Sequence, residues 1–305
     1  MRVLVIAEKR KNVSEFVETF NSKGIRARYL RILKISLVTK FKNTLIKSMG
    51  EDIPRYDAVF LQARLSLAPF IEPLLEELAS KGVYVNCKPG SYFIGENEPY
   101  KFVCLSASNV ATPRTLTSGS AKNIERVSKK ISYPLLAKSF VGMKTQQALV
   151  VENEKQLNSF VNSIKQDMDG FMLREFIEDD IISCVVIGQK VFAVRRKLRE
   201  HIVDPVEKGV SVCPSESEKQ EAIKAATACG YDIARVDLVK GRVIDVTPNV
   251  SWKKFNLVCS SNLEEAVANF YFDKIAEVGP KKNFADDLSE LKKIVSGTFF
   301  GKIFK

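Results

Sequence analysis

Two aspartates lie in neighbouring apolar runs close to residue 240. The runs "RVDLV" and "RVIDV" are separated by Lys240 and Gly241, and a two-residue spacer with glycine is typical of the tight turn of a β-hairpin. Aspartate is unfavourable in strands, and a buried carboxylate is costly unless it is paired or binds a metal. Asp237 and Asp245 are therefore candidate metal ligands. The alternative is that both face solvent on an exposed hairpin.

The first part of the chain contains the elements of an α/β sheet. Strand patterns and helix patterns alternate here, and the helix patterns end in glycine. Strands are predicted over residues 2–7, 25–32, 56–63 and 83–86, and helices over residues 12–24 and 67–82. Such alternation predicts a parallel sheet with helices on both faces. The domain would be Rossmann-like, but it has no GxGxxG motif, so we assign it no dinucleotide.

Beyond Asn86 the order of elements changes. A helix with a Pro-bounded strand is expected over residues 99–118, a helix over 121–132, and strands over 133–140 and 146–153. A helix over 153–166 and strands over 171–177 and 181–197 follow, the last interrupted by a turn at Gly188. A helix over 215–230, with serine and glutamate in its first turn and glycine at its end, leads into the aspartate hairpin.

These segments together resemble the ATP-grasp ligases, in particular the RimK-like group of amino-acid ligases. The resemblance is carried by "YPLLAKSFVG", "MLREFIEDD" and "GYDIARVDLV…VIDVTPN". It implies an α/β fold, with α+β character in the grasp part. The resemblance further implies a Rossmann-like pre-ATP-grasp domain (residues 1–95), a small lid subdomain (96–172) and a C-terminal subdomain with the metal site (173–278). A helical and basic tail (279–305) lies beyond it.

The resemblance also implies a magnesium site on the aspartate hairpin. Asp237 matches the first acid of the family, and Asp245 stands where the family usually has glutamate. Thr247 replaces the usual asparagine ligand, and Asn249, two residues further along, is placed to compensate. Magnesium prefers hard oxygen ligands and keeps some water and substrate oxygens; Mn²⁺ is the alternative ion.

A nucleotide site follows from the same resemblance. Lys138 corresponds to the phosphate-binding lysine of the family, and Lys101 lies one helical turn beyond the expected position of a second lysine. The adenine edge would meet backbone groups of the hinge, and Asp180 or Glu178 would bind the ribose. Gly142 matches the first glycine of the phosphate loop, but the following "MKTQQ" lacks the later glycines. The expected nucleotide-binding residues are Lys101, Lys138, Gly142, Glu175, Phe176, Ile177 and Asp180.

Several basic residues follow in the stretch "VRRKLREH". Arginine binds phosphate and carboxylate in a bidentate manner. We expect at least one arginine to stabilise the transferred phosphoryl group, with Arg199 as first choice and Arg196 as second. The chain has a single histidine, His201, and we expect its role to be structural.

The reaction that the resemblance implies is ATP-dependent ligation of a carboxylate to an amine through an acyl phosphate. An amino acid such as glutamate would be joined to an acidic small molecule or an acidic protein tail. Two other functions remain open. One is an ATP-grasp kinase of a polyol. The other is a binding protein built on a degraded ATP-grasp scaffold, which the missing glycines and the replaced ligands favour.

The charge of the chain is concentrated near its start. The formal net charge is +11, and residues 1–50 hold 12 Lys or Arg against three Glu. Such a block attracts polyanions, although it is also compatible with a solvated basic face. Nucleic acid is a less favoured partner, because no aromatic residues alternate with the basic ones. An acidic acceptor fits the charge, and a homo-oligomer is an open expectation.

The remaining features indicate a cytoplasmic protein. The six cysteines are scattered without a CxxC pair, which is typical of reduced thiols rather than a zinc site or disulfides. No apolar run reaches the roughly 18 residues of a membrane span, and the start does not resemble a secretory signal. In the tail, "FADDLSELKKIV" predicts a helix and "FFGKIFK" a basic aromatic end that docks on its own chain or on a second subunit.

Overall fold

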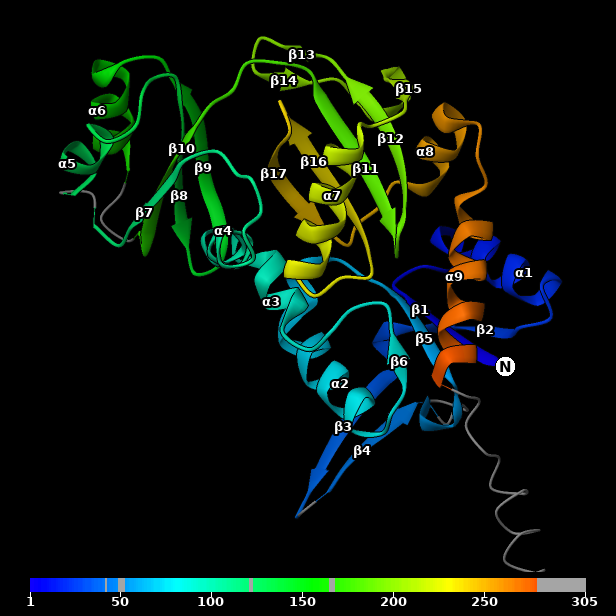
Figure 1. The fold of residues 1–305 in the computed structure, drawn as a ribbon. Coiled ribbons are helices and arrows are strands. Elements are labelled where there is room, and N and C mark those ends of the chain that lie inside the picture. Colours follow the sequence, from blue (N-terminus) through cyan, green and yellow to red (C-terminus); the bar gives the residue numbers. More distant parts are fainter. Residues whose placement is uncertain (42, 49–52, 121–122, 165–167, 279–305) are drawn as a thin grey trace, which may run out of the picture.

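The computed structural model describes residues 1–41, 43–48, 53–120, 123–164 and 168–278. Three sheets of four or five strands organise this part of the chain (Figure 1). We call them the first, second and third sheet in chain order. No helix of the described ranges is both long and apolar enough to cross a membrane. The predicted tail helix and the basic end lie outside the described residues.

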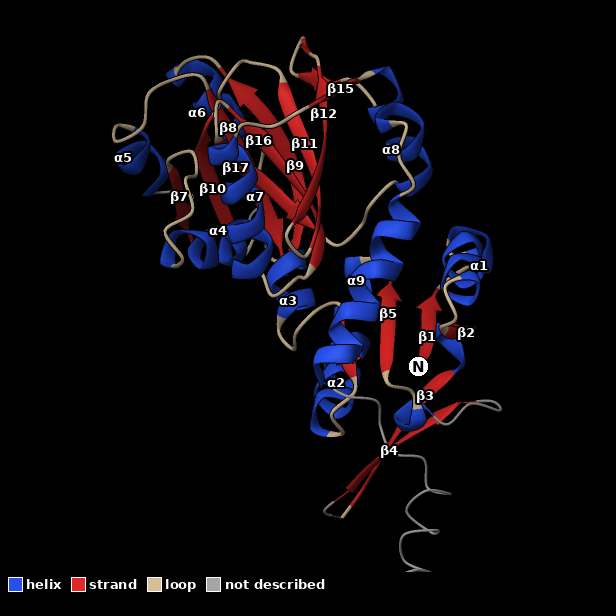
Figure 2. Ribbon diagram, turned by 45° about the vertical axis from the view of Figure 1, so that its right-hand side comes forward, coloured by secondary structure: helices blue, strands red, loops and turns tan. Residues whose placement is uncertain are grey.

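The first sheet is parallel, with strand order β2-β1-β5-β6. Alternate residues of β1 pack on opposite faces of the sheet. Leu4 packs in the core that includes α2, and Val5 packs in the core that includes α1 and α9 (Figure 2). This confirms the predicted α/β sheet, whereas its contact with the distant α9 was not predicted. The elements are β1 (Arg2–Ala7), α1 (Ser14–Ser22), β2 (Arg26–Arg31), β5 (Ala58–Gln62), α2 (Ala68–Ser80), β6 (Tyr84–Val85) and α9 (Leu263–Val278).

The basic segment after β2 forms an antiparallel hairpin, for which we predicted no element. Its strands are β3 (Ile35–Lys40) and β4 (Asn43–Ser48), and it projects from the first sheet (Figure 1). Leu37 and Ile46 pack against the core at its base, while Lys40 and Lys47 are exposed. In "ISLVTK", the β-branched residues Ile35, Val38 and Thr39 favour a strand.

The second sheet is antiparallel, with order β7-β10-β8-β9. One face packs on α5 and α6 through an apolar cluster that includes Leu135, Leu157 and Phe171. β10 extends past residue 172, so the domain boundary that we predict there falls inside a strand. The elements are β7 (Thr115–Ser118), α5 (Ile124–Ser128), β8 (Leu135–Val141), β9 (Lys144–Val151), α6 (Glu154–Ser163) and β10 (Gly170–Glu175).

The third sheet is antiparallel and has the order β15-β12-β11-β16-β17. α7 covers one face, where Ala222 and Ala226 pack with Val236 and Val246. A serine–glutamate capping box starts α7 at Ser215, as the sequence indicates. The elements are β11 (Ile181–Ile187), β12 (Lys190–Arg196), β13 (Leu198–Arg199), β14 (Ile202–Val203), β15 (Val210–Val212), α7 (Glu216–Ala228), β16 (Ile233–Val239), β17 (Arg242–Thr247) and α8 (Trp252–Cys259).

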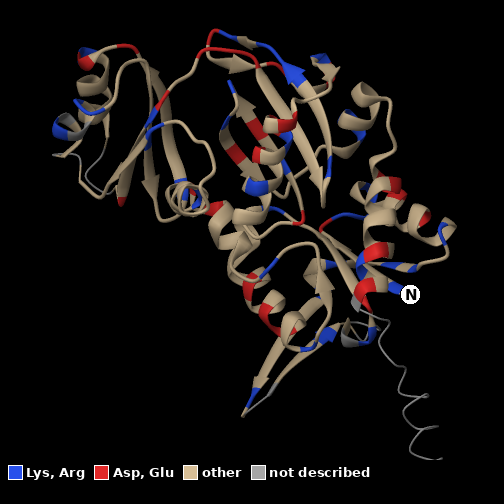
Figure 3. Ribbon diagram, viewed as in Figure 1, with Lys and Arg blue, Asp and Glu red and all other residues tan. Residues whose placement is uncertain are grey.

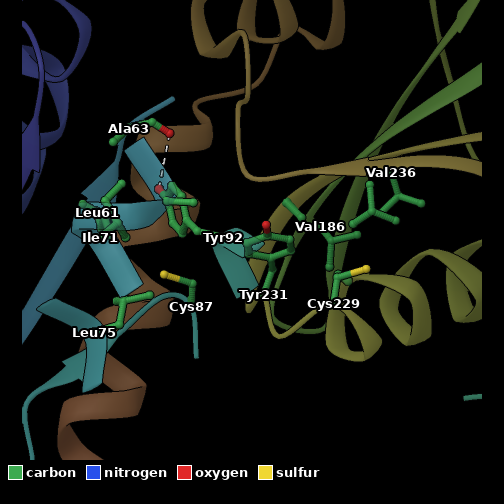
Figure 4. Packing of buried hydrophobic residues seen from close by; sticks show 14 of the residues in the cluster. Leu61, Ala63, Ile71, Leu75, Cys87, Tyr92, Val186, Cys229, Tyr231 and Val236 are labelled. Carbon is green, nitrogen blue, oxygen red and sulfur yellow. Dashed lines mark hydrogen bonds between the residues drawn. The ribbon is translucent and has the colours of Figure 1, made fainter. Parts of the chain in front are cut away.

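The first and third sheets share a continuous core. Figure 4 shows the side chains of Tyr92 and Tyr231 between apolar residues of the first sheet and those of the third. The Tyr231 hydroxyl donates to the Ser91 carbonyl at 2.6 Å, and the Tyr92 hydroxyl to the Ala63 carbonyl at 3.3 Å. Both tyrosines are fully buried with their hydroxyls bonded, as buried polar groups require. They fix α3 (Ser91–Glu96) and thus the start of α4 (Glu98–Ala107).

Replacing Gly95 by alanine is expected to destabilise this junction. A β-carbon at Gly95 would overlap Tyr231 Oη and Leu65 Cδ2. Overpacking of this kind costs about 1–3 kcal/mol of the free energy of unfolding. Gly119 is the matched control, because a β-carbon there meets no atom within 4 Å. Urea unfolding of Gly95→Ala and Gly119→Ala measures the difference, and equal midpoints would contradict the expected overlap.

Candidate active site

The aspartate hairpin forms as predicted, with a two-residue turn. Lys240 and Gly241 have φ angles of +48° and +70°. Positive φ at both residues lets a two-residue turn match the right-handed twist of the strands that it joins. Strict pairing outward from the turn would place Asp237 opposite Ile244. The register shifts after Leu238, however, and Asp237 lies opposite Asp245. The extra residue is a β-bulge, and it brings the second carboxylate to the same face of the third sheet as the first.

Asp237 is buried within a set of donors. Its carboxylate accepts hydrogen bonds from Ser183 Oγ at 2.6 Å and from Arg196 Nη2 at 3.1 Å. Arg235 Nε lies 3.4 Å from its Oδ1 atom. Arg196 Nε also donates to Ser183 Oγ at 2.7 Å, so the serine hydroxyl links the guanidinium to the carboxylate. Two cations thus neutralise a carboxylate that would otherwise be costly to bury.

Asp245 is more open than Asp237, with 39% of its side chain exposed. Lys101 Nζ lies 2.7 Å from its Oδ1 atom, and Arg235 Nη2 lies 3.5 Å from its Oδ2 atom. Desolvation alone would raise the pKa of Asp245, but the Lys101 ammonium and then Arg235 outweigh it and hold the pKa below its ordinary value. Conversely, burial alone would lower the pKa of Lys101, but Asp245 raises it. Lys101 therefore lies beside one of the two hairpin aspartates.

One face of α4 presents three side chains to the space between the second and third sheets. Glu98, Lys101 and Phe102 are spaced so that they share this face. Lys101 contacts the third sheet through Asp245, as described above. Glu98 contacts the second sheet, because its carboxylate lies 2.6 and 2.7 Å from Lys138 Nζ. Lys101 on α4 therefore reaches the third sheet, and Lys138 on β8 of the second sheet reaches α4.

Arg174 on β10 joins the two halves of the site. Its Nη1 atom donates to the Ile244 carbonyl at 2.9 Å and lies 3.4 Å from Glu98 Oε1. The guanidinium carbon also lies 5.0 Å from the centre of the Phe102 ring, within the range of a cation–π interaction. Ile244 is the extra residue of the bulge, and its carbonyl accepts the hydrogen bond that Arg174 donates from the second sheet.

The hinge between the second and third sheets is partly engaged by the protein itself. The Glu175 N–H donates to the Arg114 carbonyl at 2.9 Å, and the Phe176 N–H to the Pro134 carbonyl at 3.0 Å. These two N–H groups are therefore unavailable to an adenine edge, which leaves the hinge carbonyls and Ile177 for that role. The Phe176 ring meets His201 edge-on, with ring centres 5.1 Å apart.

The other predicted residues lie further from the carboxylates. Gly142, with a φ angle of +58°, forms the β8–β9 turn and donates its N–H to Asp169. Asp180 pairs with Lys197 at 2.9 Å. Arg199 pairs with Asp204 and is 73% exposed, and among the described residues it makes no ion pair with Asp237 or Asp245. Arg196 therefore replaces Arg199 as the first candidate for contact with a phosphoryl group.

Four residues of the site were not predicted: Ser183, Glu98, Arg174 and Arg235. A signal was present for Arg235, because it precedes Asp237 by two residues and alternation places it on the same face. A charged residue inside the apolar run "FMLREFI" was a signal for Arg174. Glu98 and Ser183 join the site only through tertiary contacts, which no local pattern reveals.

The donor set fits a magnesium ion that is shared with phosphate. Asp237 and Asp245 offer hard oxygen atoms on one face, and Thr247 follows on the same strand. Thr247 Oγ1 accepts from the Asn249 N–H at 3.2 Å, which keeps Asn249 beside it. No group of three or more His, Cys, Asp or Glu able to hold a metal occurs in the ranges that the structure describes. Such a site suits Mg²⁺, which uses one or two carboxylates together with substrate phosphates and water.

The chain is similar to known proteins of one family. The model of the RimK-like ATP-grasp domain matches residues 100–270, more than half of the chain. A "Probable alpha-L-glutamate ligase" of Cellvibrio japonicus is 23% identical over 253 residues, 79% of this chain and 83% of that protein. Another from Mannheimia succiniciproducens is 25% identical over 198 residues, 62% of this chain and 66% of that protein.

A solved structure shares the fold. The ATP-grasp ligase PsnB, in a complex with a phosphomimetic variant of its minimal precursor, Mg and ADP, has a TM-score of 0.67 and 14% sequence identity, covering 89% of this chain and 97% of that chain. At this identity the likeness concerns the fold alone. The match of the family model, together with the fold and the paired carboxylates, shows that the chain belongs to the RimK-like ATP-grasp family of ATP-dependent carboxylate–amine ligases.

Proposed function

We propose that the chain uses ATP and Mg²⁺ to join an amine to a carboxylate through an acyl phosphate. The observation that carries this proposal is the charge network between the second and third sheets. It contains five cationic and three acidic side chains, and the surplus of positive charge suits a polyanion such as a triphosphate. The cations are Lys101, Lys138, Arg174, Arg196 and Arg235, and the acids are Glu98, Asp237 and Asp245.

Five of these eight side chains have an assigned role in this proposal. Lys138 and Lys101 bind phosphate oxygens, Arg196 neutralises charge on the transferred phosphoryl group, and the hinge carbonyls hold adenine. Asp237 and Asp245 would hold Mg²⁺, which neutralises phosphate charge when bound. A substrate carboxylate oxygen then bonds to the γ-phosphorus and ADP leaves. An amine attacks the acyl carbon, phosphate departs, and a proton is lost to give the amide.

We further propose glutamate as the amino acid that is added and an acidic small molecule or protein tail as the acceptor. Several relatives are named as probable alpha-L-glutamate ligases, and PsnB is solved with a precursor peptide. The basic residues of the β2 strand and the β3–β4 hairpin support an acidic acceptor, because they are exposed and cluster on one domain (Figure 3).

The test is product analysis with purified protein, ATP, Mg²⁺, glutamate and a panel of acidic acceptors, with a panel of polyols in parallel reactions. We expect ADP and phosphate in equal amounts, with a mass increase of the acceptor that corresponds to one or more glutamyl groups. ADP together with a phosphorylated polyol and no amide would indicate the kinase instead. No nucleotide turnover with any acceptor, and an Asp237→Asn variant equal to wild type, would indicate a degraded scaffold.

A further inference from the structure

Glu98 is an acidic residue in contact with Lys138, the lysine that is proposed above to bind nucleotide phosphate. Its carboxylate receives both short contacts of Lys138, at 2.6 and 2.7 Å, and it lies 3.4 Å from Arg174. Lys138, Glu98 and Arg174 have side-chain exposures of 16%, 18% and 9%. The phosphate-binding lysine therefore already holds an anion that belongs to the protein.

The surroundings of Glu98 stabilise its negative charge. Glu98 is the first residue of α4, and the preceding Asn97 side chain accepts the Tyr100 N–H at 3.1 Å. A carboxylate in the first turn of a helix interacts favourably with the helix dipole. Glu98 therefore lies at the start of α4 against two cations, Lys138 and Arg174.

We infer that Glu98 is an internal competitor for nucleotide phosphate and sets the affinity of the site for ATP. This inference rests on the proposed function, because it takes Lys138 as a phosphate-binding residue. A phosphate oxygen that reaches Lys138 must displace the Glu98 carboxylate or accept its repulsion. Ion pairs of this kind, with little exposure, resist separation. Glu98 thereby favours the ligand with the most negative charge, since only a strong anion replaces a carboxylate on two cations.

Replacement of Glu98 by glutamine is the direct test. Gln keeps the shape of the side chain and removes its charge, so Lys138 and Arg174 become available. We expect Glu98→Gln to bind a non-hydrolysable ATP analogue with Mg²⁺ at least about fivefold more tightly than wild type, by calorimetric titration. Glu98→Ala should change the affinity in the same direction, and Glu96→Gln, which removes the same charge two residues earlier, should leave it unchanged.

The double variant Glu98→Gln/Lys138→Met separates competition from a general change in charge. Without the Lys138 ammonium, Glu98→Gln should increase the affinity for the ATP analogue much less than it does when Lys138 is present, because the competition is for that ammonium. Unchanged or weaker binding by Glu98→Gln and Glu98→Ala, while wild type binds the analogue, overturns the inference and leaves the proposed function intact. Absence of binding by wild type and all variants overturns both. Binding by Glu98→Gln alone supports the inference.

Discussion

Replacing Asp237 by asparagine is expected to lower the rate of ADP formation by a factor on the order of 10²–10³, because Asp237 would hold the Mg²⁺ that stabilises charge on the transferred phosphoryl group. Asparagine keeps the size of the side chain but removes the charge that balances Arg196 and Arg235. It also removes one of the two carboxylates that face each other across the hairpin. The measurement is steady-state ADP release in the presence of an acceptor that wild type uses.

Folding must be separated from chemistry for this variant. Removing one partner of a buried ion pair costs about 3–5 kcal/mol of the free energy of unfolding, and Asp237 is 6% exposed. The half-exposed Asp245 offers a second variant, Asp245→Asn, which should lose activity with a smaller loss of stability. Asp179→Asn, at an exposed position paired with Lys240, is the matched control. Wild-type rates in folded Asp237→Asn and Asp245→Asn would contradict the metal-site assignment.

Replacing Lys138 by methionine is expected to weaken binding of an ATP analogue by about 10- to 100-fold, the range for a hydrogen bond to a charged group. Methionine preserves the apolar stem within β8 and removes the ammonium that contacts Glu98. The dissociation constant from calorimetric titration measures the effect. Lys190→Met, at the exposed start of β12, is the control for charge alone. Equal affinity of wild type and Lys138→Met would remove Lys138 from the phosphate site.

The order of elements could be predicted from the sequence because each is local. Apolar alternation, glycine at helix ends and the "KG" turn are patterns of a few neighbouring residues. They predicted the strands and helices of the first sheet, α7 and the aspartate hairpin. The pairing of Asp237 with Asp245 could not be derived in this way. The turn alone would have paired Asp237 with Ile244, and the bulge that corrects the register is stabilised from a distance by Arg174.

The ion pairs of the site could not be predicted from the sequence either, because they join residues of different elements. Lys101 could be placed by its helical spacing, but its partner lies 144 residues away. Glu98 lies only 40 residues from Lys138, yet nothing local links a helix start to a strand centre. Arg199 and Arg196 differ by three positions, and only the fold shows that Arg196 reaches Asp237 while Arg199 is exposed beside Asp204.

The most direct measurement is calorimetric titration of the purified protein with a non-hydrolysable ATP analogue, with and without Mg²⁺, on wild type and Asp237→Asn. If Asp237 and Asp245 hold a magnesium ion that is shared with the nucleotide, wild type will bind more tightly when Mg²⁺ is present, and the folded Asp237→Asn variant will lose that increase. Binding that is indifferent to Mg²⁺, or an increase that persists in the variant, would contradict the site described here.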